Sequence, residues 1–454
     1  MVLKSSLALC FLTLVFALAQ SAAQSLSTYP NAIKDRQVRP ESPMLPPPRN
    51  QVFIDPDFGS SMIRVTDETT NSEFPGDYLQ TQGGLANEWS IDTTKFYVQG
   101  KGGREFAFSF DPATMSVGSL PNAKAGEGLL LPLRIGSSFS FVDSDLIYGT
   151  TSVDPLTITS YRFSTDTSIP IVDTRTCGVQ PPLGSGPSVV SDDDVSPSLD
   201  DTRLSISEGG SEAGKHMYVV VYDRNLGCRW YNTQTGAIGG QWGTTGLASA
   251  TTPFLINHAY LSRSGDYVVI LVAGYGWYVW DLSTLTVTSC SVSDPLNQCA
   301  GYSAVGYNSL VNSPAMTGDM QTAKRSFADI SQISELFLPG LYDWGQDHHF
   351  TWTNVNSTDT APVCASTYGY DGNTWIDEPY EGEIFCIETD GVASTVWRFA
   401  HNRATYISPY YQTQPLGSVS RDGNFFLFTS NWDAQLGLGT EGTPRADAFI
   451  VKLE

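Results

Sequence analysis

The stretch LSRSGDYVVILVAGYGWYVWDLSTLTVTS, residues 261–289, decides the fold class. Its apolar runs are short and rich in β-branched and aromatic residues, and Ser, Gly and Asp separate them, which is typical of strands joined by tight turns. Clear copies of this pattern begin at Trp89, Ser198 and Val419, and weaker copies lie near Val142, Tyr307 and Trp352. The chain therefore repeats one strand-rich unit along its length.

Seven such units, at roughly 45–70 residues each, match the period of β-propeller blades. We predict an all-β protein with a single β-propeller of seven four-stranded blades. Strand-like segments at 61–69 and 446–453 would close the ring by sharing one blade. A ring of six or eight blades and a pair of β-sandwiches are the alternative architectures. The best helical pattern, at 323–336, is short.

The amino terminus reads as a secretory signal. Lys4 precedes an apolar run and small residues follow it, so we assign residues 1–23 to a cleaved signal peptide. Residues 24–51 form a Pro-rich arm that we expect to be extended and poorly ordered. Residues 52–454 would form the propeller. The apolar run is too short to cross a membrane, and no later run is longer. We predict a secreted or periplasmic protein that acts as a monomer.

Cleavage would remove Cys10 and leave six cysteines. An even number of cysteines in an exported chain favours disulfides. Pairing of sequence neighbours is the simplest arrangement, and it predicts Cys177–Cys228, Cys290–Cys299 and Cys364–Cys386. Reduced, buried cysteines are the alternative.

Charge limits the classes of partner. The chain has 25 Lys and Arg against 47 Asp and Glu, for a formal charge of −22. A generic nucleic-acid binder needs the opposite sign, so we expect no nucleic-acid partner. Sequences typical of zincins, P-loop proteins, α/β-hydrolases and Rossmann dehydrogenases are absent.

Alignment of the repeats on their turn serine or threonine places His258, His349 and Asp194 at one offset, four residues earlier, near the start of an innermost strand. Imidazole and carboxylate groups are suitable ligands for Mn, Fe or Zn. We therefore name His258, His349 and Asp194 as candidate ligands of one divalent cation. The alternative is that they are ordinary polar residues of a water-filled channel. A calcium loop at 371–378 is a weaker candidate.

Two polar clusters surround these positions. The first runs from Gln346 through His348 to Trp352, and Asn257 is equivalent to His348. We treat Asn257, Gln346, His348, Trp352 and Tyr410 as candidate ligand-binding residues, with Trp352 expected at the surface. The second cluster holds His401 and Arg403, which are candidates for proton abstraction and enolate stabilisation. Loop hydrogen bonding is the alternative role for both.

The repeat pattern resembles that of the exported WD-type and TolB-like propellers. Within these, Asn257-His258 and Gln346 to Phe350 are similar to the channel motifs of the oligogalacturonate lyases. That resemblance implies a seven-bladed propeller whose His- and Gln-bound divalent metal assists β-elimination of uronate chains. It would make His258, Gln346 and His349 the ligands. A uronate polymer is a polyanion, however, and this acidic chain repels it at long range.

Two functions remain open at this stage. The first is a binding propeller that recognises a glycan or a protein at its top face without catalysis. The second is a metal-assisted polysaccharide lyase acting on a uronate-containing glycan. A redox propeller of the quinoprotein type is a third, for which we find no cofactor-attachment sequence.

Overall fold

The computed structural model describes thirteen stretches of the chain. They are residues 28–74, 76–84, 86–180, 195–210, 215–250, 253–272, 276–290, 303–312, 322–336, 346–369, 379–390, 395–439 and 441–454, without the side chains of 333, 335 and 346–348.

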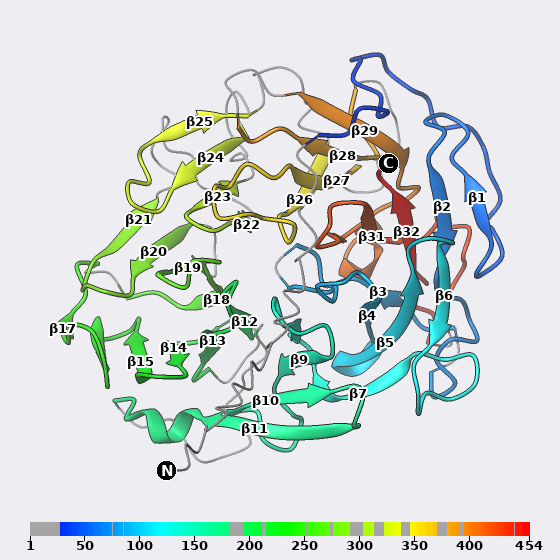
Figure 1. Ribbon diagram of the computed structural model, residues 1–454. Coiled ribbons are helices and arrows are strands. Elements are labelled where there is room, and N and C mark those ends of the chain that lie inside the picture. Colours follow the sequence, from blue (N-terminus) through cyan, green and yellow to red (C-terminus); the bar gives the residue numbers. More distant parts are fainter. Residues whose placement is uncertain are drawn as a thin grey trace, which may run out of the picture.

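In these residues, antiparallel strands form seven sheets that follow one another around a ring (Figure 1). We number the sheets as blades along the chain. Blade 1 contains β3 (Leu79–Gln80), β4 (Lys95–Gly100), β5 (Arg104–Asp111) and β6 (Ser116–Ser119), and β7 (Leu129–Arg134) also pairs with β5. Blade 2 contains β8 (Ser138–Phe139), β9 (Leu146–Gly149), β10 (Thr157–Arg162) and β11 (Thr167–Asp173). Blade 3 contains β12 (Ser196–Pro197), β13 (Arg203–Glu208), β14 (Tyr218–Asp223), β15 (Gly227–Asn232), β16 (Ala237–Gly240) and β17 (Gly246–Leu247).

The remaining blades continue around the ring. Blade 4 contains β18 (Ile256–Leu261), β19 (Tyr267–Val272), β20 (Trp277–Asp281) and β21 (Val287–Cys290). Blade 5 contains β22 (Ser303–Val305), β23 (Ser309–Asn312), β24 (Ala323–Ser326) and β25 (Ile333–Glu335). Blade 6 contains β26 (Gln346–Thr351), β27 (Val363–Gly369), β28 (Glu383–Ile387) and β29 (Val396–His401). Blade 7 contains β30 (Gly417–Val419), β31 (Phe425–Ser430), β32 (Asp447–Lys452), β2 (Ser61–Arg64) and β1 (Val52–Ile54). Short 3₁₀ turns span Lys101–Gly103, Thr174–Cys177 and Tyr411–Thr413.

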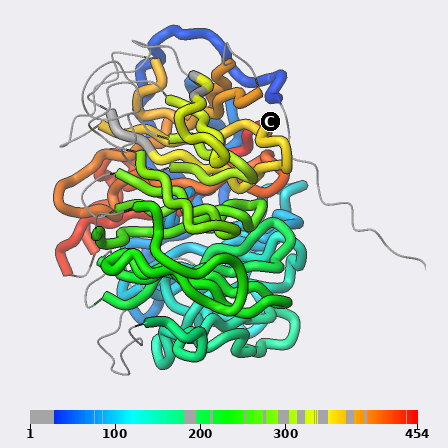
Figure 2. The backbone as a smooth tube through the Cα atoms, turned by 90° about the vertical axis from the view of Figure 1, so that its left-hand side faces the viewer, coloured from blue at the N-terminus to red at the C-terminus, as the bar shows by residue number. Residues whose placement is uncertain are grey.

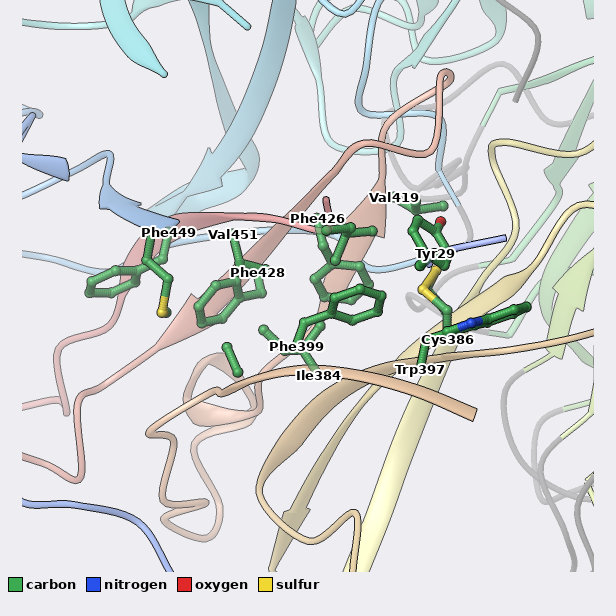
Figure 3. Close-up of a cluster of buried hydrophobic side chains, with 14 of the residues drawn as sticks. Tyr29, Ile384, Cys386, Trp397, Phe399, Val419, Phe426, Phe428, Phe449 and Val451 are labelled. Atoms are coloured by element: carbon green, nitrogen blue, oxygen red, sulfur yellow. A yellow bond between two sulfur atoms is a disulfide. The ribbon is translucent and has the colours of Figure 1, made fainter. Parts of the chain in front are cut away.

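The core lies between the blades. Each of the seven apolar clusters joins two neighbouring blades. Strand β31 shows how the sequence achieves this, because successive side chains of a strand face opposite sides of its sheet. Phe425 and Leu427 pack toward blade 1, whereas Phe426 and Phe428 pack toward blade 6 (Figure 3). A strand covered on both faces therefore reads as the continuous apolar run at 425–428.

The two ends of the chain close the ring in one blade, as predicted. Strand β2 pairs with β32, and Met62 lies opposite Val451. Arg64 donates from Nε to Asp447 Oδ2 across this pair at 3.0 Å. The described part of the chain is a seven-bladed β-propeller.

The described part of the Pro-rich arm packs against the propeller. Tyr29 is fully buried between Trp397 and Phe399, and its hydroxyl donates to the carbonyl of Gly423 at 2.9 Å. Ile33 forms a β-bridge with Arg398. Figures 1 and 2 both show the blue arm lying along the orange strands of blade 6. The arm packs because its few apolar residues fit the exposed edge of that blade.

Two further expectations can be compared with the structure. The pairs Cys177–Cys228 and Cys364–Cys386 are confirmed as disulfides, and Cys299 of the third pair lies outside the described residues. The helix expected at 323–336 is wrong, since β24 and β25 lie there. Within the described residues, no helix is long and apolar enough to cross a membrane.

Candidate functional site

The two predicted channel histidines lie on the edge strands nearest the ring centre. His258 is on β18 and His349 is on β26, each the first strand of its sheet (Figure 1). A register irregularity between Ile256 and His258 sets Asn257 outside the regular pairing with β19. His258 is half-buried, and its ring stacks on that of Tyr260 at 5.9 Å.

His349 lies in a group of polar and aromatic side chains. Its Nε2 is 3.2 Å from Oε1 of Gln414, and its ring stacks on Tyr368 with centroids 6.0 Å apart. The ring of Tyr411 meets His349 edge-on at 6.3 Å, and Tyr406 meets Tyr368 at 5.9 Å. We call these five residues the Tyr–His surface.

The loop between blades 6 and 7 supplies three members of the Tyr–His surface. After β29 the chain crosses to the start of β30 and forms the 3₁₀ turn Tyr411–Thr413 on the way. The hydroxyl of Thr413 donates to the carbonyl of Tyr410 at 2.7 Å and fixes this turn. The turn leaves Tyr411 42% exposed, whereas His349 is 5% exposed. The predicted ligand residue Tyr410 is half-buried beside it.

Sequence reasoning missed Tyr368 and Tyr406. Tyr368 is on β27, the strand next to β26, and the strand pairing places it opposite Asp347. It therefore shares the face of β26 that carries His349. The signal was the aromatic position two residues beyond Ser366, the cross-strand partner of His349. Tyr406 carried no comparable signal, because its position depends on the path of a loop.

The predicted metal site is not assembled by the described residues. Asp194 lies outside them, and so do the side chains of Gln346 and His348 and the calcium loop at 371–378. Among the residues that are described, no group of three or more His, Cys, Asp and Glu could hold a metal ion. Of the predicted ligands only His258 and His349 can be placed, and Nε2 of His349 faces the Gln414 amide oxygen.

His401 and Arg403, the candidates for proton abstraction and enolate stabilisation, belong to a different part of blade 6 from His349. His401 ends β29, which is three strands from β26 in the order of blade 6. At ~4.8 Å between neighbouring strands, about 14 Å of sheet separates His401 from His349. The two side chains therefore belong to opposite edges of blade 6.

His401 and Arg403 are buried at the outer edge of blade 6, which we call the rim. His401 is fully buried, its Nε2 lies 3.6 Å from Asp57 Oδ2, and its ring meets Phe58 at 5.0 Å. Burial lowers the pKa of His401 to about 4. Arg403 is 1% exposed and pairs with Glu41 of the arm at 2.9 Å. Glu41 of the arm contacts Arg403, whereas Asp57 and Phe58, which follow β1, contact His401.

Trp352 corrects the expectation of surface exposure. It is 1% exposed and packs in the cluster between blades 5 and 6. Its indole Nε1 donates to the carbonyl of Ala361 at 2.7 Å, and Lys324 lies over its ring. Trp352 is therefore part of the core, and Tyr411 is the exposed aromatic residue of this region.

The fold defines the class of this protein as a seven-bladed β-propeller. Two solved structures with a similar fold are oligogalacturonate lyases. The first, from Vibrio parahaemolyticus, is 11% identical with a TM-score of 0.54, and the match covers 88% of this chain and 96% of that one. The second, an oligogalacturonate lyase in complex with manganese, is 12% identical with a TM-score of 0.54, and the match covers 89% and 96%. At these identities the likeness shows the shared fold alone. No protein-family model matches the chain, and no curated protein matches it.

Proposed function

We propose that this propeller is an exported binding protein that recognises a glycan through the Tyr–His surface. The observation that carries the proposal is the half-exposed ring of Tyr411 held against the buried ring of His349. Aromatic rings offer a large apolar face at a low cost in conformational entropy, and such residues dominate binding energies. A sugar presents a matching apolar face and a rim of hydroxyl groups.

Charge and redox state support this proposal. A chain with a formal charge of −22 attracts no polyanion from a distance, so a neutral glycan is the better partner. The disulfides Cys177–Cys228 and Cys364–Cys386 suit an oxidising compartment, where extracellular glycans are found.

The test is binding of neutral glycans measured by calorimetry, after a glycan-array screen of the full chain. We expect Tyr411→Ala to weaken binding about tenfold, or about 1.4 kcal/mol, because a stacking ring is lost. Leu247→Ala is the matched control, since Leu247 is a 71% exposed apolar residue on β17 of another blade. Unchanged affinity in Tyr411→Ala would contradict the proposal. Binding of a protein but of no glycan would replace the glycan with a protein ligand.

A polysaccharide lyase is the second candidate. It is supported weakly by the fold shared with two oligogalacturonate lyases, and by histidines on the innermost strands of blades 4 and 6. Elemental analysis of untagged protein tests it first, with about one equivalent of Mn, Fe or Zn expected. A His258→Ala/His349→Ala variant should lose that metal. Unsaturated uronate product, followed by its ultraviolet absorbance, tests turnover. Protein with neither metal nor product would eliminate this candidate and leave the binding proposal standing.

A further inference from the structure

The turn that follows each innermost strand repeats one position. This position directly follows the Ser or Thr of the turn. In six turns it is occupied by Ile91, Phe141, Leu199, Arg263, Asn354 and Arg421. Backbone hydrogen bonds connect neighbouring turns, because the carbonyl of Arg263 accepts from Leu199 N and the amide of Arg263 donates to Gly306 O, both at 2.8 Å. We call these six residues the axial collar. Asn354 follows the last residue of β26 and lies five residues beyond His349, so the collar is at the carboxyl end of that strand.

Three side chains of the axial collar meet at the centre of the ring. The guanidinium carbon Cζ of Arg263 lies 4.7 Å from the ring centroid of Phe141, and that of Arg421 lies 5.9 Å from it. Phe141 follows β8 of blade 2, Arg263 follows β18 of blade 4 and Arg421 follows β30 of blade 7. No two of these blades are neighbours, so their side chains can meet only across the axis of the propeller.

Within the part of the chain that the structure describes, both arginines are buried without a counter-charge. Arg263 is 3% exposed and Arg421 is 8% exposed. The side chain of each donates one hydrogen bond to a described residue, Arg263 to Pro197 O at 3.3 Å and Arg421 to Val355 O at 2.6 Å. Among the described residues neither forms an ion pair with a carboxylate, and the buried Nε of each has no hydrogen-bond partner there. Burial lowers the pKa of Arg263 to about 9, helped by the charge of Arg421, and that of Arg421 to about 10, so both are cations at neutral pH.

The carboxylate of Asp201 contacts the turn that carries Phe141, but it already accepts hydrogen bonds from other groups. Asp201 accepts from the backbone amide of Phe141 at 3.0 Å and from the hydroxyls of Ser140 and Tyr148. It holds the turn of blade 2 and forms no ion pair with Arg263 or Arg421. Next to Val355, the amide oxygen and nitrogen of fully buried Asn354 also have no partner among the described residues.

Two like charges in one buried place are unfavourable unless an opposite charge joins them. Guanidinium groups bind carboxylates and inorganic oxyanions through paired N–H donors, and the free Nε atoms are such donors. We propose that the axial collar binds one small oxyanion, a carboxylate or an inorganic anion of the sulfate type, between Arg263 and Arg421. This site is separate from the Tyr–His surface and does not rest on the glycan proposal.

Thermal unfolding of the whole protein tests the site. Sodium sulfate and sodium galacturonate are titrated against sodium chloride at equal ionic strength. We expect the specific anion to raise Tm by on the order of 2–5 °C beyond the chloride series at a hundredfold excess over Kd. In Arg421→Met this increment should disappear, because one of the two donors is gone. Arg162→Met is the matched control, since Arg162 pairs with Asp143 and Asp145 at the surface.

Comparison of the two anions distinguishes a sugar-acid carboxylate from an inorganic anion as the ligand. A shift with galacturonate alone identifies the carboxylate of a sugar acid, and a shift with sulfate alone identifies an inorganic anion. Crystals of the unmodified protein soaked in selenate, an anomalous analogue of sulfate, and a galacturonate soak give a second readout that needs no variant. Equal Tm increments in the unmodified protein and Arg421→Met, or soaks that leave the axis between Arg263 and Arg421 empty, would overturn the proposal.

Discussion

Buried arginines at the rim and at the axis of this propeller differ in what surrounds them. At the rim, Arg398 and Glu383 are both fully buried and are joined by hydrogen bonds of 2.7 and 2.5 Å. At the axis, Arg263 and Arg421 share the ring of Phe141 and have only carbonyl partners among the described residues. At the rim the arginine belongs to a structural ion pair, whereas at the axis the two arginines are available to bind an anion.

The amino-terminal arm explains the rim. Arg398 donates to the carbonyls of Asp35 and Gln37, and Arg403 pairs with Glu41. Arg64 of β2 donates to the carbonyl of Pro47 at 3.0 Å. The arm therefore supplies both carbonyl acceptors and the carboxylate of Glu41 to these buried cations. At the axis the described residues supply only the carbonyls of Pro197 and Val355.

The largest expected effect comes from breaking the rim pair. Glu383→Gln leaves Arg398 buried with its main counter-charge removed, which should lower the free energy of unfolding by about 3–5 kcal/mol. Chemical denaturation measures this loss, and proteolysis of the arm should accelerate with it. Replacing both partners in Glu383→Leu/Arg398→Met should recover most of the loss. A single variant as stable as the unmodified protein would show that the rim pair is no more structural than the axial arginines.

The second largest expected effect is a loss of stability at low pH, through protonation of His401. The pKa of His401 is lowered to about 4 from 6.5, so between these values the unfolded chain binds a proton that the folded chain does not. Its contribution to stability is complete above pH 6.5 and is lost as pH falls toward 4, by about 3 kcal/mol. Denaturation midpoints at pH 7 and pH 4.5 measure this change.

Other groups titrate in the same range, so the comparison of two proteins carries the result. His401→Gln should have a flatter dependence of stability on pH than the unmodified protein. Parallel pH profiles for the two would mean that His401 is not the group that is protonated.

The smallest expected effect is at the surface. Arg175 pairs with Asp154 and Asp173, but its side chain is 42% exposed. Water screens such a pair, so Arg175→Gln should change the free energy of unfolding by less than about 1 kcal/mol. The same denaturation experiment measures it. A loss as large as that of Glu383→Gln would mean that burial is not what distinguishes these arginines.

The sequence predicted the architecture well because each blade repeats the same local pattern. Turn residues at 262–265 and 420–423, with the closing strands near both ends, determine the ring before any side chain is placed. The segment 323–336 was misjudged as helical since its two strands are short and their alternation is brief. Packing between blades prevailed there over local propensity.

The site was less predictable because it depends on contacts between distant segments. The repeat offset found His258 and His349 on their innermost strands. The burial of His401, in contrast, depends on Asp55 and Phe58, which are more than 340 residues away in the chain. No local pattern reveals such a partner, and the paths of the arm and of the loop holding Tyr411 have no repeat to predict them.

The position of β32 between β31 and β2 has a consequence for the order of events during biosynthesis. Strand β2 leaves the ribosome early, yet its partner β32 comes almost four hundred residues later. Until then the edge of β2 is open, and open strand edges pair with other chains. The ring can close only after synthesis of residues 447–452, so every copy passes through a stage in which β2 can pair with another chain.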